Sequence, residues 1–88
     1  MTSIVELGAL EGDVAKPVFR ASAGGIDFYV ELDSSALLKL AGGHRVDDWK
    51  GAVEGERGRI RSAAQMLYDS GFVSGDMSRL FVTAIDIV

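Results

Sequence analysis

The stretch PVFRASAGGIDFYVELD, residues 17–33, decides the fold because it predicts two strands joined by a tight turn. Apolar and polar residues alternate through residues 26–33, and this period of two places the apolar side chains on one face of a strand. Gly24 and Gly25 can supply the positive φ angles that a tight hairpin turn requires. We therefore expect a β-hairpin with one buried face and one solvated face.

A short helix is predicted directly after the hairpin, in residues 34–41. Asp33 or Ser34 can accept a hydrogen bond from the free amides at its start. Its apolar side consists of Ala36, Leu37 and Leu40. Gly42 and Gly43 can end the helix in a left-handed conformation.

A long amphipathic helix is predicted next, from residue 49 to residue 70. Its apolar stripe recurs at intervals of three and four residues and consists of Trp49, Val53, Ile60, Ala64 and Leu67. Asp47 is a suitable N-cap. Gly71 suits the left-handed position after a helix, and we expect Phe72 to fold back there on Leu67.

The two ends of the chain contain further strand candidates. The segment RLFVTAIDIV, residues 79–88, is apolar on both alternating faces, which predicts a strand with neighbours on both sides. Near the N-terminus, Ile4, Val5 and Leu7 are compatible with an additional edge strand, although Gly8 interrupts the pattern.

These elements predict a single α+β domain over residues 1–88. We expect a two-layer structure, in which two helices cover one face of a mainly antiparallel sheet, with the order strand, strand, helix, helix, strand. The pairing of the last strand stays open, because the pattern fits both a parallel and an antiparallel neighbour for residues 26–33.

Composition narrows the classes of function. The chain has 88 residues, no cysteine and a formal net charge of -4. The absence of cysteine excludes disulfides, thiolate zinc sites and a cysteine nucleophile. No stretch has the length of a membrane span, and the first residues lack the pattern of a signal peptide, so we expect a cytoplasmic protein. The negative charge disfavours non-specific binding to nucleic acid or to anionic membranes.

Three glycines interrupt the predicted long helix: Gly51, Gly55 and Gly58. On a continuous helix they would lie within about 60° of one another, opposite the apolar stripe. Each would cost about 1 kcal/mol relative to alanine. Three interpretations remain open: tolerated glycines on a solvated face, a helix broken near Gly55, or close packing of a partner helix or second subunit against the bare backbone.

One flank of the same helix is basic. Lys50, Arg57, Arg61 and Tyr68 align on it, and Glu54 neutralises part of the charge. A solvated flank is one interpretation. The other is a surface that binds an acidic protein or nucleic-acid phosphates, with Tyr68 available for stacking.

Glu56 lies within the apolar stripe of this helix. A carboxylate in such a place needs a cation or hydrogen-bond donors. We expect it to pair with Arg20, Arg45 or a backbone amide. No second catalytic group supports a role as a catalytic acid.

No catalytic, cofactor or metal site is predicted elsewhere. His44 is the only histidine, and we expect it to be an ordinary loop residue. Asp27, Glu31 and Asp33 share one face of a strand, where neighbours two apart are separated by roughly 7 Å, too far for all three to close on one cation. We expect them to be solvated.

The residues also resemble a family of short bacterial proteins known as domain of unknown function 1488 (DUF1488). The hairpin and following helix, PVFRASAGGIDFYVELDSSALLKL, and the closing LFVTAIDI are similar to its pattern. Four helix positions are similar to its F-x-x-x-R-x-x-I-x-x-x-A run: Val53, Arg57, Ile60 and Ala64. Val53 departs from the usual phenylalanine, and the helix glycines lie outside the pattern. The resemblance implies a small cytoplasmic α+β protein without an established activity or cofactor, and it marks Arg57 for testing.

Two hypotheses for function follow. The first is a non-enzymatic interaction or accessory module that binds a protein partner or a second copy, through the helix flank or an unpaired sheet edge. The alternative is a weak nucleic-acid-binding regulator that uses Lys50, Arg57 and Arg61. The candidate interaction residues are Lys50, Gly51, Gly55, Arg57, Gly58, Arg61 and Tyr68.

Overall fold

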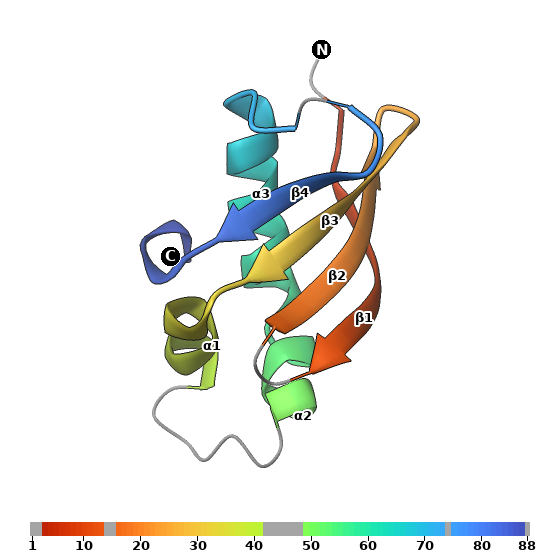
Figure 1. Cartoon of the computed structure of the whole chain (residues 1–88). Helices are drawn as coiled ribbons and strands as arrows, with labels where there is room; N and C mark the ends of the chain where they lie inside the picture. The colour runs from red at the N-terminus through yellow and green to blue at the C-terminus, as the bar shows by residue number, and fades with distance from the viewer. Residues whose placement is uncertain (1–2, 14–15, 42–48, 74, 88) are drawn as a thin grey trace.

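The computed structural model describes residues 3–13, 16–41, 49–73 and 75–87, and these form a sheet with helices packed against it (Figure 1). The strands are β1 (Glu6–Asp13), β2 (Lys16–Ala23), β3 (Ile26–Leu32) and β4 (Ser78–Val82). The helices are α1 (Ser34–Ala41), α2 (Trp49–Glu54), α3 (Arg57–Asp69) and the short 3-10 helix η2 (Ala84–Asp86). The predicted α+β class and the order of elements are confirmed, with β1 as the additional N-terminal strand.

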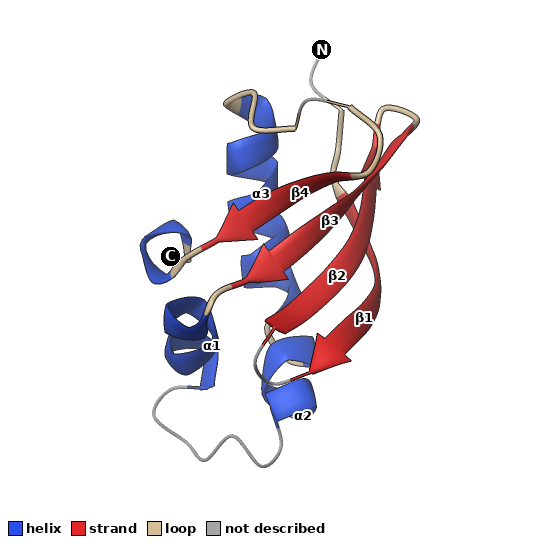
Figure 2. Cartoon of the chain, viewed as in Figure 1, coloured by secondary structure: helices blue, strands red, loops and turns tan. Residues whose placement is uncertain are grey.

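The sheet has the order β1-β2-β3-β4 (Figure 2). The predicted hairpin is formed by β2 and β3, whose antiparallel register pairs Ala23 with Ile26. Gly24 and Gly25 make the turn with φ angles of 57° and 80°, which residues with a side chain rarely adopt. β1 pairs antiparallel with β2, and the register shifts between Leu7 and Leu10, which marks a β-bulge.

β4 pairs with β3 in the parallel direction, which settles the pairing that the sequence left open. A parallel neighbour cannot be reached by a tight turn, because the chain must first return to the other end of the sheet. The helices make this return: α3 lies across one face of the sheet, and α1 and α2 lie at the end where β3 stops (Figure 2). The helical region is therefore the connection that places β4 at an edge.

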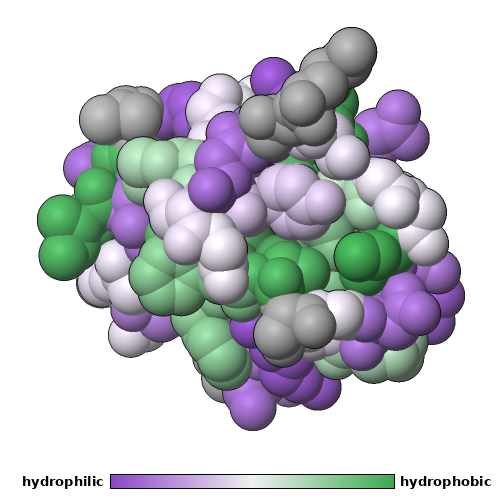
Figure 3. Space-filling view, turned by 90° about the horizontal axis from the view of Figure 1, so that it is seen from above, coloured by the Kyte–Doolittle hydropathy of each residue, from purple (hydrophilic) through white to green (hydrophobic). Residues whose placement is uncertain are grey.

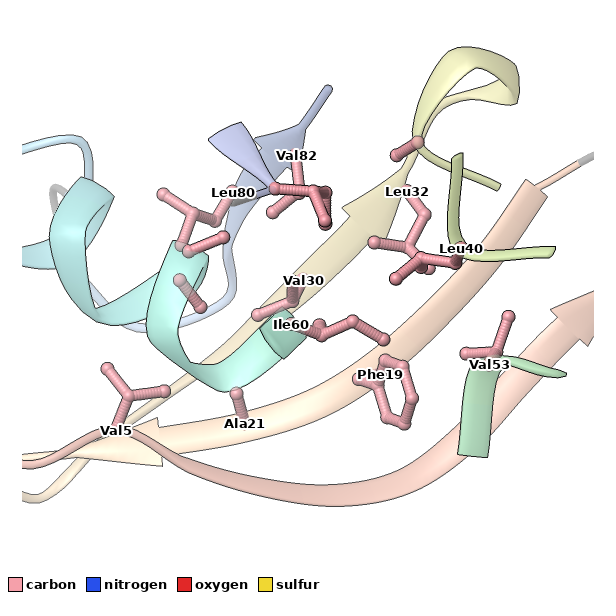
Figure 4. Close-up of a cluster of buried hydrophobic side chains, with 14 of the residues drawn as sticks. Val5, Phe19, Ala21, Val30, Leu32, Leu40, Val53, Ile60, Leu80 and Val82 are labelled. Carbon is pink, nitrogen blue, oxygen red and sulfur yellow. The ribbon is translucent and has the colours of Figure 1, made fainter. Parts of the chain in front are cut away.

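The core lies between the sheet and the helices (Figure 4). The sheet contributes large side chains that are almost fully buried, among them Phe19, Phe28, Val30 and Leu80. The helices contribute Ala36, Leu37, Leu40, Val53, Ile60, Ala63 and Ala64. Burial of one large aliphatic side chain contributes roughly 1.5–3 kcal/mol, so this single cluster is the main source of stability.

α1 begins at the predicted N-cap. The Oδ1 atom of Asp33 accepts hydrogen bonds from the amide of Ala36 at 2.8 Å and from the hydroxyl of Ser35 at 2.6 Å. Asp33 is therefore a capping residue, and of the two candidates it is the one that caps. Several predictions concern residues outside the part of the chain that the structure describes. These residues are the helix-ending Gly42 and Gly43, the N-cap Asp47, and the loop residues His44 and Arg45.

The prediction of one long helix is wrong, because a turn at Gly55 and Glu56 separates α2 from α3. Of the three interpretations of the helix glycines, the structure agrees with a helix broken near Gly55. In the turn the amide of Glu56 donates to the carbonyl of Val53, three residues back, which is tighter than an α-helical bond. The break allows Val53 and Ile60, which are both fully buried, to face the core from two separate helices.

The predicted end of the long helix is confirmed. Gly71 has a φ angle of 88°, and the amide of Phe72 donates to the carbonyl of Leu67 at 3.1 Å. This is the hydrogen bond of a Schellman motif. Phe72 nevertheless stays 64% exposed, so it folds back at the surface and not into the core.

The prediction of a final strand with neighbours on both sides is also wrong. β4 ends at Val82, and only β3 pairs with it among the described residues. The chain then leaves the sheet because Asp86 Oδ2 accepts hydrogen bonds from the amide of Thr83 at 3.0 Å and from its hydroxyl at 3.1 Å. The outward face of this segment is consequently exposed, with Phe81 at 56% and Ile85 at 89%.

Gly58 provides a test of this arrangement. A Cβ atom at Gly58 would meet nothing within 4 Å, so Gly58→Ala should raise the free energy of unfolding by several tenths of a kcal/mol to about 1, through helix propensity. Denaturant unfolding measures the change. Gly25 is the matched control, since its surroundings are equally open but its φ angle is 80°; Gly25→Ala should destabilise. Destabilisation by Gly58→Ala would contradict an uncovered α3 surface.

Candidate interaction surface

Arg57, a member of the predicted basic flank, connects α3 to β1. Its guanidinium donates to the carbonyl of Gly8 at 2.7 Å and to that of Leu7 at 3.3 Å. It also pairs with Glu54 at 3.0 Å and lies over the ring of Phe19, 5.0 Å from the centroid. Its donors are thus directed to groups within the chain, and its main role is to hold the bulged part of β1.

Gln65 performs the same task two turns further along α3. Its Oε1 atom accepts a hydrogen bond from the amide of Val5 at 2.7 Å, and its Nε2 atom donates to the carbonyl of Ser3 at 2.8 Å. The sequence does not single out this residue, because a glutamine beside an apolar stripe carries no pattern of its own. Arg57 and Gln65 together form a clamp, defined here as the two side chains that bind the backbone of residues 3–8.

The other members of the flank do not form one surface. Tyr68 stacks on Phe28 with the ring centroids 6.0 Å apart, so it belongs to the border of the core and is not free for stacking with a ligand. Lys50 and Arg61 are exposed, but the break between α2 and α3 places them on separate helices. Three exposed glycines lie around this break: Gly51 in α2, Gly55 in the turn itself and Gly58 in α3.

The carboxylates differ from expectation at two positions. Glu56 is partly exposed and pairs with Arg59 at 3.4 Å, not with Arg20 or a core group, because it lies in the turn and not on the stripe of a continuous helix. Glu31, expected to be solvated, has a side chain only 12% exposed and pairs with Arg79 at 2.8 Å. In the register of β3 and β4, Glu31 lies opposite Phe81.

The residues that the structure describes contain no group of three or more potential metal ligands. Within the same residues, no helix has the length and apolar character needed to cross a membrane. The exposed surfaces of the described residues include the two edges of the sheet, at β1 and at β4.

The outer edge of β4 is the most distinctive of these surfaces. The amide of Asp33 donates to the carbonyl of Val82 at 3.1 Å, so Val82 directs its peptide groups toward β3. Since alternate residues of a strand direct their peptide groups to opposite sides, Leu80 does the same, and Arg79 and Phe81 direct theirs to the free edge. An unpaired edge of this kind can accept another strand.

An apolar groove of about 340 Å³ runs beside this edge. It is lined by Leu67, Phe72, Arg79, Leu80, Phe81 and Asp86. The exposed Phe72 belongs to the segment between α3 and β4. This segment lies at the end of the molecule seen in Figure 3, where hydrophobic side chains reach the surface among polar ones. Two exposed phenylalanines and two free peptide groups thus lie in one place.

The clamp can be tested by substitution. Arg57→Ala should lower the free energy of unfolding by about 1–2 kcal/mol, because two carbonyls of β1 lose a charged donor that is itself partly exposed. Arg57→Lys should recover less than half of the loss, since an ammonium cannot reproduce the planar fork. Chemical denaturation measures both variants. Equal stability of Arg57→Ala and the parent protein would contradict the clamp.

No protein-family model and no curated protein matches the chain. A comparison with solved structures matches it to a crystal structure of a protein of unknown function from the DUF1488 family of Shewanella loihica PV-4. The two chains are 19% identical, the match covers 89% of this chain and 93% of the other, and the TM-score is 0.66. This chain therefore has the fold of a DUF1488 protein, in agreement with the resemblance of its sequence.

Proposed function

We propose that this protein is a non-enzymatic interaction module, a bacterial cytoplasmic member of the DUF1488 family, that binds a partner strand along the free edge of β4. The observation that supports the proposal is the combination of an unpaired edge with the apolar groove beside it. In strand addition, main-chain hydrogen bonds give affinity and pockets for alternate side chains give specificity. The free edge of β4 offers the main-chain groups, and the groove beside it offers a pocket for side chains.

The two edges of the sheet differ in a way that favours β4. The outer strand β1 is interrupted by its bulge and carries the acidic residues Glu6, Glu11 and Asp13. Bulges and charges are the devices by which proteins prevent unwanted pairing at an edge. β4 has the sequence SRLFV, without proline or lysine, and its one charge is paired with Glu31. Among the described strands, β4 therefore has the edge with neither a bulge nor an unpaired charge.

The alternative, a nucleic-acid-binding regulator, has less support. It relied on Lys50, Arg57 and Arg61. The guanidinium of Arg57 is directed to two carbonyls of β1 and to Glu54, and Lys50 and Arg61 lie on separate helices. On the uncovered face of the sheet, Arg20 pairs with Glu11 at 2.9 Å and Arg79 pairs with Glu31. Neutralisation of phosphates needs basic groups that are not already neutralised.

A peptide selection tests the proposal. The native protein is used to select binders from a random peptide library displayed on phage. Enriched peptides should alternate apolar and polar residues, because alternate side chains of an added strand point toward the molecule. Phe81→Lys should weaken the binding of the synthesised peptides by about tenfold or more, which corresponds to about 1.4 kcal/mol.

Ile4→Lys is the matched control, because Ile4 is 70% exposed and precedes β1, on the far side of the sheet from β4. This variant should bind the peptides as the native protein does. A selection without enrichment, or peptides that bind Phe81→Lys and the native protein equally well, would contradict the proposal.

A further inference from the structure

We infer that the strand which pairs with β4 is β4 of a second copy, in an antiparallel register with the two-fold axis at Leu80. This inference rests on the proposed function and names its partner. The dimer would be isologous, because the same edge is used by both copies. Four strands from each copy would form one continuous sheet.

The free peptide groups determine the register. A two-fold axis at Leu80 places Arg79 of one copy opposite Phe81 of the other, and both residues direct their amide and carbonyl to the edge. Each such pair exchanges two hydrogen bonds. Leu80 would face Leu80 of the second copy as a pair that exchanges no hydrogen bonds. This agrees with the pairing of β4 with β3, because the peptide groups of Leu80 are directed to β3.

The neighbouring registers lack donors. An axis at Phe81 would pair Arg79 with Thr83, but the amide of Thr83 already donates to Asp86 Oδ2 at 3.0 Å. An axis at Arg79 would pair Phe81 with Met77, but the amide of Met77 already donates to the carbonyl of Asp27 at 2.7 Å. It would also place Arg79 opposite Arg79, and like charges directly opposite are unfavourable.

The side chains are complementary in the register centred on Leu80. The guanidinium of Arg79 would lie beside the ring of Phe81 of the second copy, an arrangement that favours a cation–π contact. The guanidinium is already held in place by Glu31 at 2.8 Å and by the ring of Tyr29, 5.6 Å from its centroid. No acidic residue would face another across the new strand pair, so the net charge of -4 is not concentrated at the interface.

Sedimentation equilibrium of the native chain tests the dimer. The weight-average mass should rise from that of one chain to that of two between low and high micromolar concentrations. Phe81→Lys would bring two cations together in the new strand pair and should weaken dimerisation by at least tenfold. Ile4→Lys should dimerise like the native chain. A native chain that stays monomeric at high micromolar concentration would overturn the inference.

Cysteine cross-linking tests the register in a chain that has no native cysteine. Hydrogen-bonded pairs in antiparallel strands have Cα atoms about 5.5 Å apart, which a disulfide can bridge. A mixture of Arg79→Cys and Phe81→Cys chains should therefore form a mixed disulfide under mild oxidation, faster than either variant forms one with itself. Equal rates, or faster linkage within one variant, would overturn the register.

The two proposals fail separately. If the chain is monomeric but its β4 edge still binds selected peptides, the proposed interaction module is supported and the dimer is excluded. If the chain neither dimerises nor selects peptides that depend on Phe81, both proposals are excluded. A dimer that forms equally well in Phe81→Lys and in the native chain uses another surface and overturns the inference.

Discussion

The contact between α3 and one face of the sheet is the interaction on which the rest of the structure depends. α3 presents Ile60 flanked in space by the small residues Ala63 and Ala64, all fully buried. Small side chains allow the helix backbone to approach the sheet closely, and Ile60 then fills the space above Phe19 and Val30 (Figure 4). The helical connection crosses this face, and the last strand enters the sheet parallel to β3, which requires such a crossover.

The same contact explains why the two edges of the sheet have different properties. β1 lies on the side where Arg57 and Gln65 reach from α3, and their side chains bind the backbone of residues 3–8. Among the described residues, β4 has no such clamp beside it, and its outward peptide groups at Arg79 and Phe81 stay free. One helix thus secures one edge and leaves the opposite edge available, and this asymmetry is the basis of the proposed interaction.

The local elements were predictable from sequence because their signals are local. The alternation in residues 26–32, the glycines of the turn, the cap at Asp33 and the end of the helix at Gly71 each depend on neighbours in the chain. The break at Gly55 was only one of three open interpretations, because glycine weakens a helix without determining whether tertiary packing ends it. The burial of Glu31 required knowledge of which strand lies beside it.

The residues of the candidate interaction surface were less predictable than the fold, because their contacts also depend on partners distant in the chain. Arg57 was singled out through its spacing and its family resemblance, but its partners are carbonyls about 50 residues away in the chain. Phe81 belonged to a segment whose apolar pattern predicted burial, and only the pairing of β4 with β3 shows that one of its faces is exposed. The order of strands in a sheet is a long-range property, which periodicity does not encode.

Amide hydrogen exchange of the native chain, followed residue by residue by NMR at a low concentration, tests the central claim most directly. If β4 is an edge strand with one paired and one free side, the amides of Leu80 and Val82 should exchange slowly, and those of Arg79 and Phe81 should exchange much faster. Equally strong protection of all four amides at dilution would show that the edge is already covered within the chain, and would contradict the account.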